Sequence, residues 1–519
     1  MAMMWIGIII LLVSIINFFN LSTASGMLRS KEIGLRKING STRGMIMTQF
    51  VAESVILTFV SMIIAIGVAN LLIPWFGRFV GAEYHVIMMD KWWAWLLLLG
   101  GSLTVGLFAG SYPAVVLSKT DPINALYTGR DTTGFGVVAM RRILVVFQLV
   151  VSICIIACTL IISSQLNFLR TKDLGFDKDQ IYILSYNRTI YEHYDAFVSE
   201  LSKNPRIGGI SETGGYLGNI DNGTEIEMEL DGEKFKSVYK IVYATDSSFF
   251  STFGIPLLQG RAPYEYEPGS IVLNKSAFDR LDAKDYNRIT ITNMSGRDNP
   301  SPDGMMVRVT GVCEDFNFMP LNKSLVEPLA IVFYGGNRYG VINLKLLASS
   351  MDEFASVLEE INAVYDKFDS DEPLNGTFLD SHLRHVYQAE ETFKETFTIF
   401  SMCAMVISCF GLFGLIVFSN ARRRKEIGIR RVNGSTVGQI LILLISDYLK
   451  YTTIAIVLAV PITYYIIFQW LRDYPYKVSI GWGNFALAGA IVLAIVVLTV
   501  GIESWRCATA NPVKSLKSE

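Results

Sequence analysis

Charged residues are scarce in this sequence, and the two signs nearly balance. Of the 519 residues, 18% are charged and 51% are hydrophobic, whereas a soluble protein carries about 25% charged residues. The net charge of −2 gives the chain as a whole no electrostatic reason to bind nucleic acid. The composition therefore predicts a membrane protein with no nucleic-acid partner.

Motifs for metal, redox and phosphate chemistry are also missing. The six cysteines include no Cys-x-x-Cys pair, and Cys313 is alone in the long polar segment, so we expect no disulfide framework and no zinc or redox site. No Gly-x-x-x-x-Gly-Lys-Ser/Thr phosphate loop occurs. His382 and His385 lie three apart but outside any His-Glu-x-x-His frame, so we interpret them as surface or packing residues and expect no metal site. No catalytic pattern occurs in the polar segment, so we expect no catalytic residues.

Seven stretches are long and apolar enough to cross a bilayer as helices, which takes about 20 residues. The predicted spans are 4–21, 50–76, 92–117, 143–162, 397–418, 440–468 and 485–502. A polar segment, residues 169–390, separates the fourth span from the fifth. Its pattern predicts strands at 180–184, 208–213, 238–243, 270–274, 305–313, 328–334, 341–346 and 375–379, and helices at 190–203, 245–253 and 350–366. The fold class is therefore a polytopic α-helical membrane protein with an α+β domain, with 294–304 as a loop and an unbroken helix from Asp380 through Phe418.

Lysine and arginine set the orientation of the spans. They gather in 22–44, 118–142, 421–438 and the tail after 505. The alternate connections, 74–91 and 470–483, are poor in them. With seven spans, one orientation places every basic segment in the cytoplasm, so we expect 169–390 outside and the C-terminus inside. The first span resembles a signal peptide at Ser22-Thr23-Ala24, but no basic residue precedes it, which favours a span.

The chain contains an internal repeat. Residues 29–44, RSKEIGLRKINGSTRG, recur as residues 423–438, RRKEIGIRRVNGSTVG, and residues 121–126 echo 511–516 at nearly the same spacing. The repeat predicts two copies of one membrane unit, with the first span in the place of the fifth. The expected domains are a first unit at 1–128, the first span of the second unit at 141–168, the α+β domain at 169–390, and the rest of the second unit at 391–519. The first copy has three spans and the second has four, so we expect the first to lack a leading span and domain.

Each basic loop predicts a short cytoplasmic helix that turns into a span. An acid precedes an arginine by four residues in both copies, which supports a helix. Asn39-Gly40 and Asn433-Gly434 supply a left-handed stop, and the Ser-Thr pair that follows can cap the next helix. A positive-inside anchor requires only charge, whereas this shape is kept twice, which indicates a docking partner.

Two acids lie inside predicted spans at equivalent places in the repeat, Glu53 and Asp447. Buried acids are costly in a bilayer and often functional. They are either part of a polar conduit or proton site, or members of ion pairs with a nearby base such as Lys450. We favour the ion pair. Gly106 and Gly110 form a Gly-x-x-x-Gly motif that permits close helix packing.

These loops resemble the coupling loops of the FtsX-like permease family, whose pattern is Arg-x-Lys/Arg-Glu-Ile-Gly-x-Arg-x-x-x-Gly-Ala/Ser. The polar segment is similar to the family's MacB-type periplasmic core domain at 172–177, 249–256 and 311–316. The resemblance implies that the loops dock on a separate ABC ATPase. The residues it assigns to this coupling are Lys31, Glu32, Gly34, Arg36 and Gly40 in one copy, and Lys425, Glu426, Gly428, Arg430 and Gly434 in the other.

The resemblance implies a non-catalytic permease subunit of an ATP-driven ABC complex in the bacterial cytoplasmic membrane. Hydrolysis of ATP by a dimeric partner ATPase would move the outer domain for export or extraction of a substrate. The chain itself would bind no cofactor, and its other expected partners are membrane lipid and either a missing N-terminal permease portion or a second permease copy. The alternatives are a signal or force transducer that regulates an envelope enzyme or senses peptides, and an inactive fragment of a longer permease.

Overall fold

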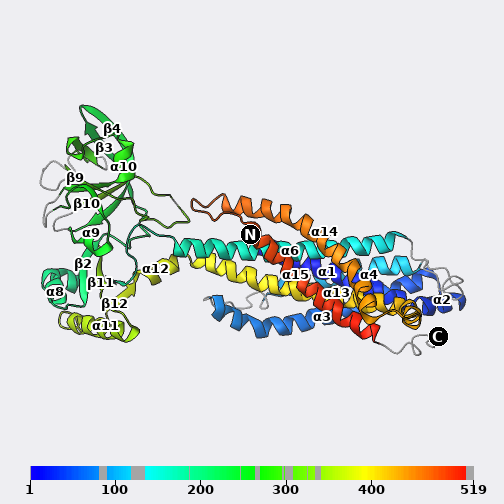
Figure 1. The fold of residues 1–519 in the computed structure, drawn as a ribbon. Helices are drawn as coiled ribbons and strands as arrows, with labels where there is room; N and C mark the ends of the chain where they lie inside the picture. The colour runs from blue at the N-terminus through cyan, green and yellow to red at the C-terminus, as the bar shows by residue number, and fades with distance from the viewer. Residues whose placement is uncertain are drawn as a thin grey trace. The chain divides into compact units, whose positions relative to one another are not determined.

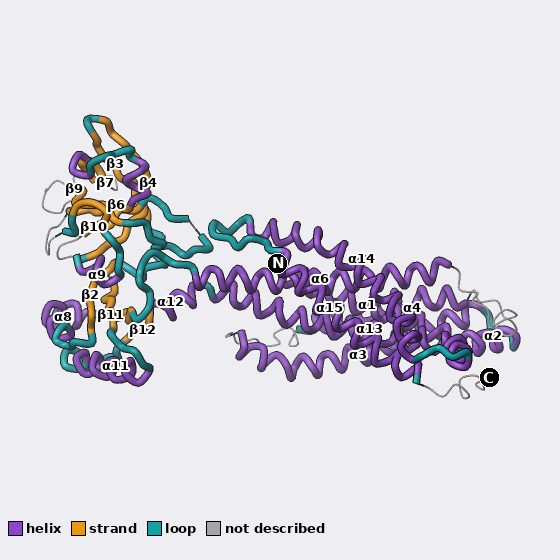
Figure 2. Tube along the Cα trace, viewed as in Figure 1, coloured by secondary structure: helices purple, strands orange, loops and turns teal. Residues whose placement is uncertain are grey.

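The computed structural model describes residues 2–80, 91–118, 135–185, 187–245, 247–263, 269–294, 297–298, 308–323, 325–333 and 340–509. The chain forms two compact units, each assembled from separate stretches of sequence. The first comprises Met1–Ser164, Thr392–Gln469 and Ser479–Glu519, and the second comprises Gln165–Glu391 and Trp470–Val478. Figure 1 labels the elements along the chain, and Figure 2 shows that the described strands belong to the second unit.

The membrane unit, as we call the first unit, is helical. Its helices, some of which extend beyond it, are α1 (Ala2–Leu28), α2 (Ser30–Ile38), α3 (Arg43–Val80), α4 (Trp92–Ser118), α6 (Phe135–Thr171), α13 (Gln388–Val432), α14 (Val437–Leu471) and α15 (Trp482–Ala508). All except α2 contain a stretch long and apolar enough to cross a membrane, which gives seven candidate spans within the described residues. These lie at the seven predicted places, so the predicted number of apolar helices is confirmed. The echo at 121–126 and 511–516 lies outside the described residues.

Helix α6 is the central helix of the membrane unit. Of its apolar window 72% is buried, against 0% for the window of α3. Its buried polar side chains face α13: the Ser152 and Ser408 hydroxyls lie 2.7 Å apart, and the Thr159 and Ser401 hydroxyls lie 2.6 Å apart. In a membrane, apolar side chains are as stable against lipid as against another helix. Interhelical hydrogen bonds of this kind therefore help to hold the helices together.

The two copies of the repeat meet at equivalent positions. The offset that relates Gly40 to Gly434 also relates Asn17 in α1 to Gly411 in α13. A Cβ atom at Gly411 would lie 2.5 Å from Asn17 Oδ1, so the glycine makes room for the amide. The first copy and the second copy thus pack against each other through a residue and its own repeat counterpart.

The predicted Gly-x-x-x-Gly motif packs α4 against α3. A Cβ atom at Gly106 would lie 2.8 Å from the Cα of Val55, and one at Gly110 would lie 2.7 Å from the Cβ of Ser54. Real Cβ atoms do not approach so closely, so only glycine at both positions permits this helix pair.

The strands described in the second unit, called here the mixed domain, form one sheet. Its strands are β1 (Ile181–Ser185), β2 (Ile207–Thr213), β3 (Gly223–Leu230), β4 (Glu233–Ala244), β5 (Leu257–Gly260), β6 (Ser270–Asn274), β7 (Ile289–Met294), β8 (Arg297–Asp298), β9 (Arg308–Cys313), β10 (Leu329–Phe333), β11 (Val341–Leu346) and β12 (Asn375–Phe378). The order is β10-β6-β9-β7-β3-β4-β2-β11-β1-β12, with β5 on β9 and β8 on β7. Strand β10 also pairs with β4 in parallel. This pairing closes β10, β6, β9, β7, β3 and β4 into a ring.

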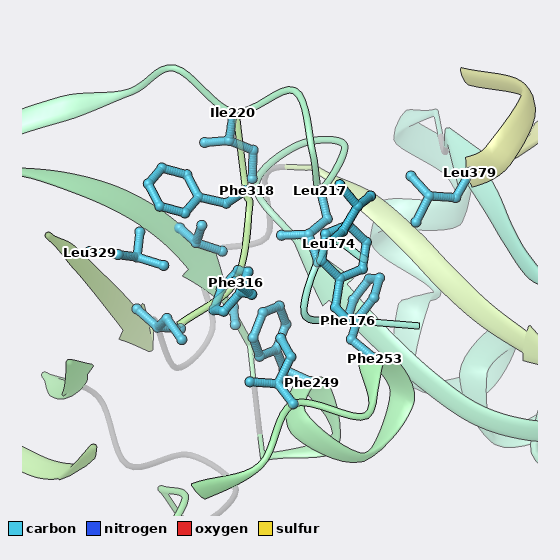
Figure 3. Packing of buried hydrophobic residues seen from close by; sticks show 14 of the residues in the cluster. Leu174, Phe176, Leu217, Ile220, Phe249, Phe253, Phe316, Phe318, Leu329 and Leu379 are labelled. Carbon is cyan, nitrogen blue, oxygen red and sulfur yellow. The ribbon is translucent and has the colours of Figure 1, made fainter. Parts of the chain in front are cut away.

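Side chains point alternately to the two faces of β4, β6 and β10, and they fill two hydrophobic cores, one on each face. In β4, Tyr239 and Ile241 point into the ring, whereas Val242 and Ala244 point to the opposite face, as a two-residue period requires. That opposite face carries an aromatic cluster around Phe316, which Figure 3 shows together with the phenylalanines of α9 (Ser248–Phe253). Strands β6 and β10 are likewise buried on both faces, which explains their continuous apolar sequences.

The predicted strands and helices of this domain occur, with additions. Each of the eight predicted strands overlaps an observed one, whereas β3, β5, β7 and β8 were not predicted. The remaining helices are α7 (Arg188–Glu192), α8 (Tyr194–Leu201), α10 (Lys275–Arg280), α11 (Met351–Tyr365) and α12 (Leu379–Val386). The single helix expected at 190–203 is wrong, because it breaks at His193 into α7 and α8. Within the predicted loop 294–304, Arg297–Asp298 forms β8 and the greater part lies outside the described residues.

The expectation of an unbroken helix from Asp380 through Phe418 is also wrong. Helix α12 ends at Val386 and α13 begins at Gln388. Between them Tyr387 is buried in the aromatic cluster, and its hydroxyl oxygen accepts a hydrogen bond from the Leu321 backbone N–H at 3.1 Å. Anchoring this side chain in the domain core interrupts the helix.

A short segment between α14 and α15 belongs to the mixed domain, which the sequence did not predict. Segment Trp470–Val478 is bound by the buried Gln165 side chain, which donates to the Tyr476 carbonyl at 2.8 Å and accepts from the Val478 N–H at 2.8 Å. The Tyr476 hydroxyl donates to Asn317 Oδ1 at 2.9 Å. Tyr476 and Val478 of this segment are therefore held to the mixed domain by hydrogen bonds with Gln165 and Asn317.

Candidate coupling loops

Two basic loops of the membrane unit contain the predicted site residues. In the first copy, α2 follows α1 after a bend at Arg29 and ends at Ile38. In the second copy the corresponding residues are the last turns of α13, which runs to Val432 without a break. The expectation of a separate short helix is therefore correct for the first copy and wrong for the second. Gly26, which precedes the bend, is a weak helix former, whereas Asn420 stands in its place in the second copy.

The stop and the following cap form as predicted. Gly40 and Gly434 have φ of 96° and 91°, in the left-handed region that glycine adopts without strain. Thr42 and Thr436 then accept hydrogen bonds from the backbone N–H three residues on, at 3.4 Å and 3.3 Å. In the second copy Gln439 returns a bond to the Thr436 N–H at 3.0 Å, which completes a capping box. The chain reverses direction in the same way in both loops.

An apolar contact anchors each loop to the helix that follows it. In the first copy Ile33 packs against Ile46 and Phe50. In the second copy Ile427 packs against Ile440 and Leu444, the residues at equivalent repeat positions. Gly34 and Gly428, which follow these isoleucines, are buried as well. The same hydrophobic triad thus holds both loops.

Ion pairs add to this anchor and differ between the copies. Arg36 bonds Glu32 at 2.8 Å, and Arg430 bonds Glu426 at 2.8 Å. These are the predicted pairs four residues apart. The side chains of Lys31 and Lys425 lie outside the described residues.

In the first copy the pair extends into a closed ring of five side chains. Arg36 also donates to Gln49 Oε1 at 2.6 Å, Gln49 donates to Glu53 at 3.0 Å, and Arg29 bonds Glu53 at 2.8 Å and Glu32 at 3.5 Å. Leu443 stands in the place of Gln49 in the second copy, so the ring has no counterpart there. The first loop is consequently cross-linked to α3 more completely than the second is to α14.

The two acids predicted to lie inside spans, Glu53 and Asp447, form ion pairs, which is the alternative favoured from the sequence. Glu53 pairs with Arg29, and Asp447 pairs with Arg423 at 3.4 Å, both across 24 residues. Lys450, the base expected from the sequence, is a further partner of Asp447 at 3.7 Å. The principal partner of each acid is an arginine of the basic loop, Arg29 or Arg423. Because this arginine and the acid recur at the same spacing in both copies, the repeat could have indicated these pairs.

Replacing both acids by amides should change stability little. Both carboxylates retain about two-fifths of their exposure, and exposed ion pairs are worth about 0.2–1 kcal/mol. We expect Glu53→Gln with Asp447→Asn to shift the thermal unfolding midpoint of the purified protein by no more than a few degrees. A much larger shift would show that these pairs contribute more than exposed ion pairs do.

Each loop also exposes two apolar residues that the sequence analysis did not select. Leu35 and Ile38 are 56% and 60% exposed, and their repeat counterparts Ile429 and Val432 are 52% and 65% exposed. Their spacing of three residues places them on one helical face, different from that of the buried isoleucine. Apolar residues at these positions in both copies, in an otherwise basic segment, are the signal that could have found them.

Among the described residues, no group of three or more His, Cys, Asp or Glu side chains is arranged to hold a metal ion. His382 stacks on Tyr216 with ring centroids 4.0 Å apart, and burial lowers its pKa. This contact agrees with its interpretation as a packing residue.

The FtsX-like permease C-terminal family matches residues 4–122 and 398–512. The two matched stretches are the two copies of the repeat. The two matches begin at equivalent positions of the repeat, in α1 and α13, so the family also identifies the first span with the fifth. The resemblance noted from the loop sequences is thereby confirmed for the two copies of the repeat.

Similar proteins are permeases of ABC transporters. The chain is 36% identical over 122 residues to the uncharacterized ABC transporter permease YknZ of Bacillus subtilis, which covers 22% of this chain and 28% of that protein. It is 38% identical over 124 residues to the macrolide export ATP-binding/permease protein MacB of Bdellovibrio bacteriovorus, covering 23% and 18%. The MacB protein of Rhodopirellula baltica is 32% identical over 116 residues, covering 22% and 16%. The chain thus spans less than a third of the length of these relatives.

Proposed function

We propose that this chain is the permease subunit of an ATP-driven complex that converts ATP hydrolysis on a separate ABC ATPase into motion of the mixed domain. The observation that carries the proposal is the pair of exposed faces on the two loops. Each face presents two exposed apolar residues, and each loop is held by the same triad and the same left-handed turn. An anchor to the membrane requires none of this geometry.

The two faces suit a partner with two equivalent sites. Exposed apolar side chains at equivalent positions of both loops gain free energy when a partner removes them from water. A dimeric ATPase would receive one loop on each subunit, with Lys31 and Lys425 and the neighbouring glycines as the other coupling residues. The chain contributes no ATP site of its own to this proposal, since ATP is used by the partner.

The route from the loops to the mixed domain runs through continuous elements. Helix α13 connects the second loop to the domain without a break from Val432 back to Gln388. Helix α6 enters the domain at Gln165, which also binds the segment between α14 and α15. We propose that residues 169–390 lie on the extracytoplasmic side of a bacterial cytoplasmic membrane and that these connections move them during export or extraction of a substrate.

Reconstitution with an ABC ATPase tests the proposal. The full chain and an ATPase of a MacB-type system, supplied as a separate polypeptide, should co-purify from detergent, and hydrolysis in lipid should rise several-fold over that of the ATPase alone. A chain that copurifies but leaves hydrolysis unchanged would point to the transducer alternative, and a chain that binds none of the ATPases tested would contradict the proposal.

A further inference from the structure

A small cavity of about 230 Å³ lies within the mixed domain. It is enclosed by the last turn of α6, the segment that follows this helix, and α12. Its floor is apolar and consists of side chains that are at most 7% exposed: Leu169, Leu174, Met319 and Leu383. The cavity is below the range of about 300–1,000 Å³ typical of drug-sized ligands, so it fits part of a molecule rather than a large one.

The rim of the cavity is cationic. Arg170, Lys178 and Arg384 line it, against the single carboxylate of Asp380. Arg384 pairs with Asp380, and Arg170 pairs with Glu391. Lys178 donates to the backbone carbonyl of Arg170 at 2.9 Å. A guanidinium carries five N–H donors and an ammonium three, so these contacts leave donors on the rim for a ligand.

The position along the chain identifies where a ligand would come from. Leu169 and Arg170 are among the last residues of the candidate span Ala139–Thr171. This candidate span has 33 residues, more than the about 20 that the bilayer core requires, so its last turn lies at or beyond the headgroup layer, where arginine and lysine extend toward phosphates. A lipid headgroup is therefore the anionic ligand nearest to this turn.

We propose that the cavity binds an anionic phospholipid. Its phosphate would lie against Lys178 and Arg384, and the first part of its apolar stem would lie on Leu169 and Leu383. An apolar floor beneath a cationic rim matches both parts of such a molecule, whereas a free anion would use only the rim. The proposal does not rest on coupling to an ATPase.

Lipid retention by the full chain tests the site. The purified protein, exchanged into neutral detergent with equal amounts of phosphatidylglycerol and phosphatidylcholine, is examined by native mass spectrometry. We expect preferential retention of phosphatidylglycerol, reduced about tenfold in the double variant Lys178→Gln with Arg384→Gln, because two charge-assisted contacts are removed. Arg188→Gln is the matched control, since that side chain is 91% exposed and does not line the cavity.

Competition separates the possible ligands. Short-chain phosphatidylglycerol should displace the bound lipid, whereas inorganic phosphate at the same concentration should not. Lys178→Arg should retain binding, since it keeps the charge. Equal retention of the two lipids, equal retention by the double variant and wild type, or displacement by inorganic phosphate alone would each overturn the proposal.

Discussion

Replacing Leu35 and Ile429 together by glutamate should abolish binding of the ATPase while leaving the chain folded and inserted. Both side chains are more than half exposed, so neither supports the fold. In a complex each would be removed from water, and burying such a side chain stabilises by about 1.5–3 kcal/mol. Losing two, with carboxylates in their place, should lower the amount of co-purified ATPase more than tenfold, since every 1.4 kcal/mol is about a factor of ten.

Val238→Glu is the control for this experiment, because Val238 is 62% exposed on β4 of the mixed domain. It should bind the ATPase like wild type. The variant Arg36→Ala with Arg430→Ala should give a smaller loss, since both arginines already bond the acid four residues before them. If the glutamate variant co-purifies with the ATPase as well as wild type does, the loops serve only as positive-inside anchors.

Replacing Gly40 and Gly434 by valine should uncouple the ATPase by a different route. Space is not the obstacle, because a Cβ atom at either position would have no neighbour within 4 Å. The obstacle is the backbone, since a left-handed residue with a side chain costs about 1–2 kcal/mol, and more when it is β-branched. We expect the turn to rearrange, so that stimulated hydrolysis falls to the basal rate and limited proteolysis cuts the loops.

A graded series distinguishes strain from crowding. Gly40→Asn with Gly434→Asn should retain most activity, because asparagine tolerates the left-handed region. Gly438→Val should be near wild type, since Gly438 has equally open space without a positive φ. Valine and asparagine variants of equal activity would show that the left-handed turn does not matter for coupling.

Features set by neighbouring residues could be predicted from the sequence. The Asn-Gly stops, the threonine caps and the pairs of Glu32 with Arg36 and of Glu426 with Arg430 all depend on residues a few positions apart. The seven apolar helices follow from hydropathy over about 20 residues. An arginine and an acid recur at the same spacing in both copies, so the repeat could have indicated the pairs of Glu53 with Arg29 and of Asp447 with Arg423, for which the sequence analysis named only Lys450.

The apolar residues of the loops can be read from the sequence, but only the structure shows which of them are exposed. Leu35 and Ile38 are apolar, and so is Ile33, so composition alone does not tell which of them is buried. The structure assigns Ile33 to the anchor and leaves the other two exposed. The distinction depends on Ile46 and Phe50, which come from the next helix.

By itself, then, the sequence determined the seven apolar helices, the internal repeat, most strands, and the left-handed stops and caps of the loops. The tertiary structure alone decided which distant segments meet. Strand β10 closes the ring on β4, Gln165 binds Tyr476 and Val478, and Tyr387 breaks the helix by inserting into the aromatic cluster. Hydropathy and helix propensity are properties of a short window, whereas each of these contacts joins residues whose partners are chosen by packing of the whole domain.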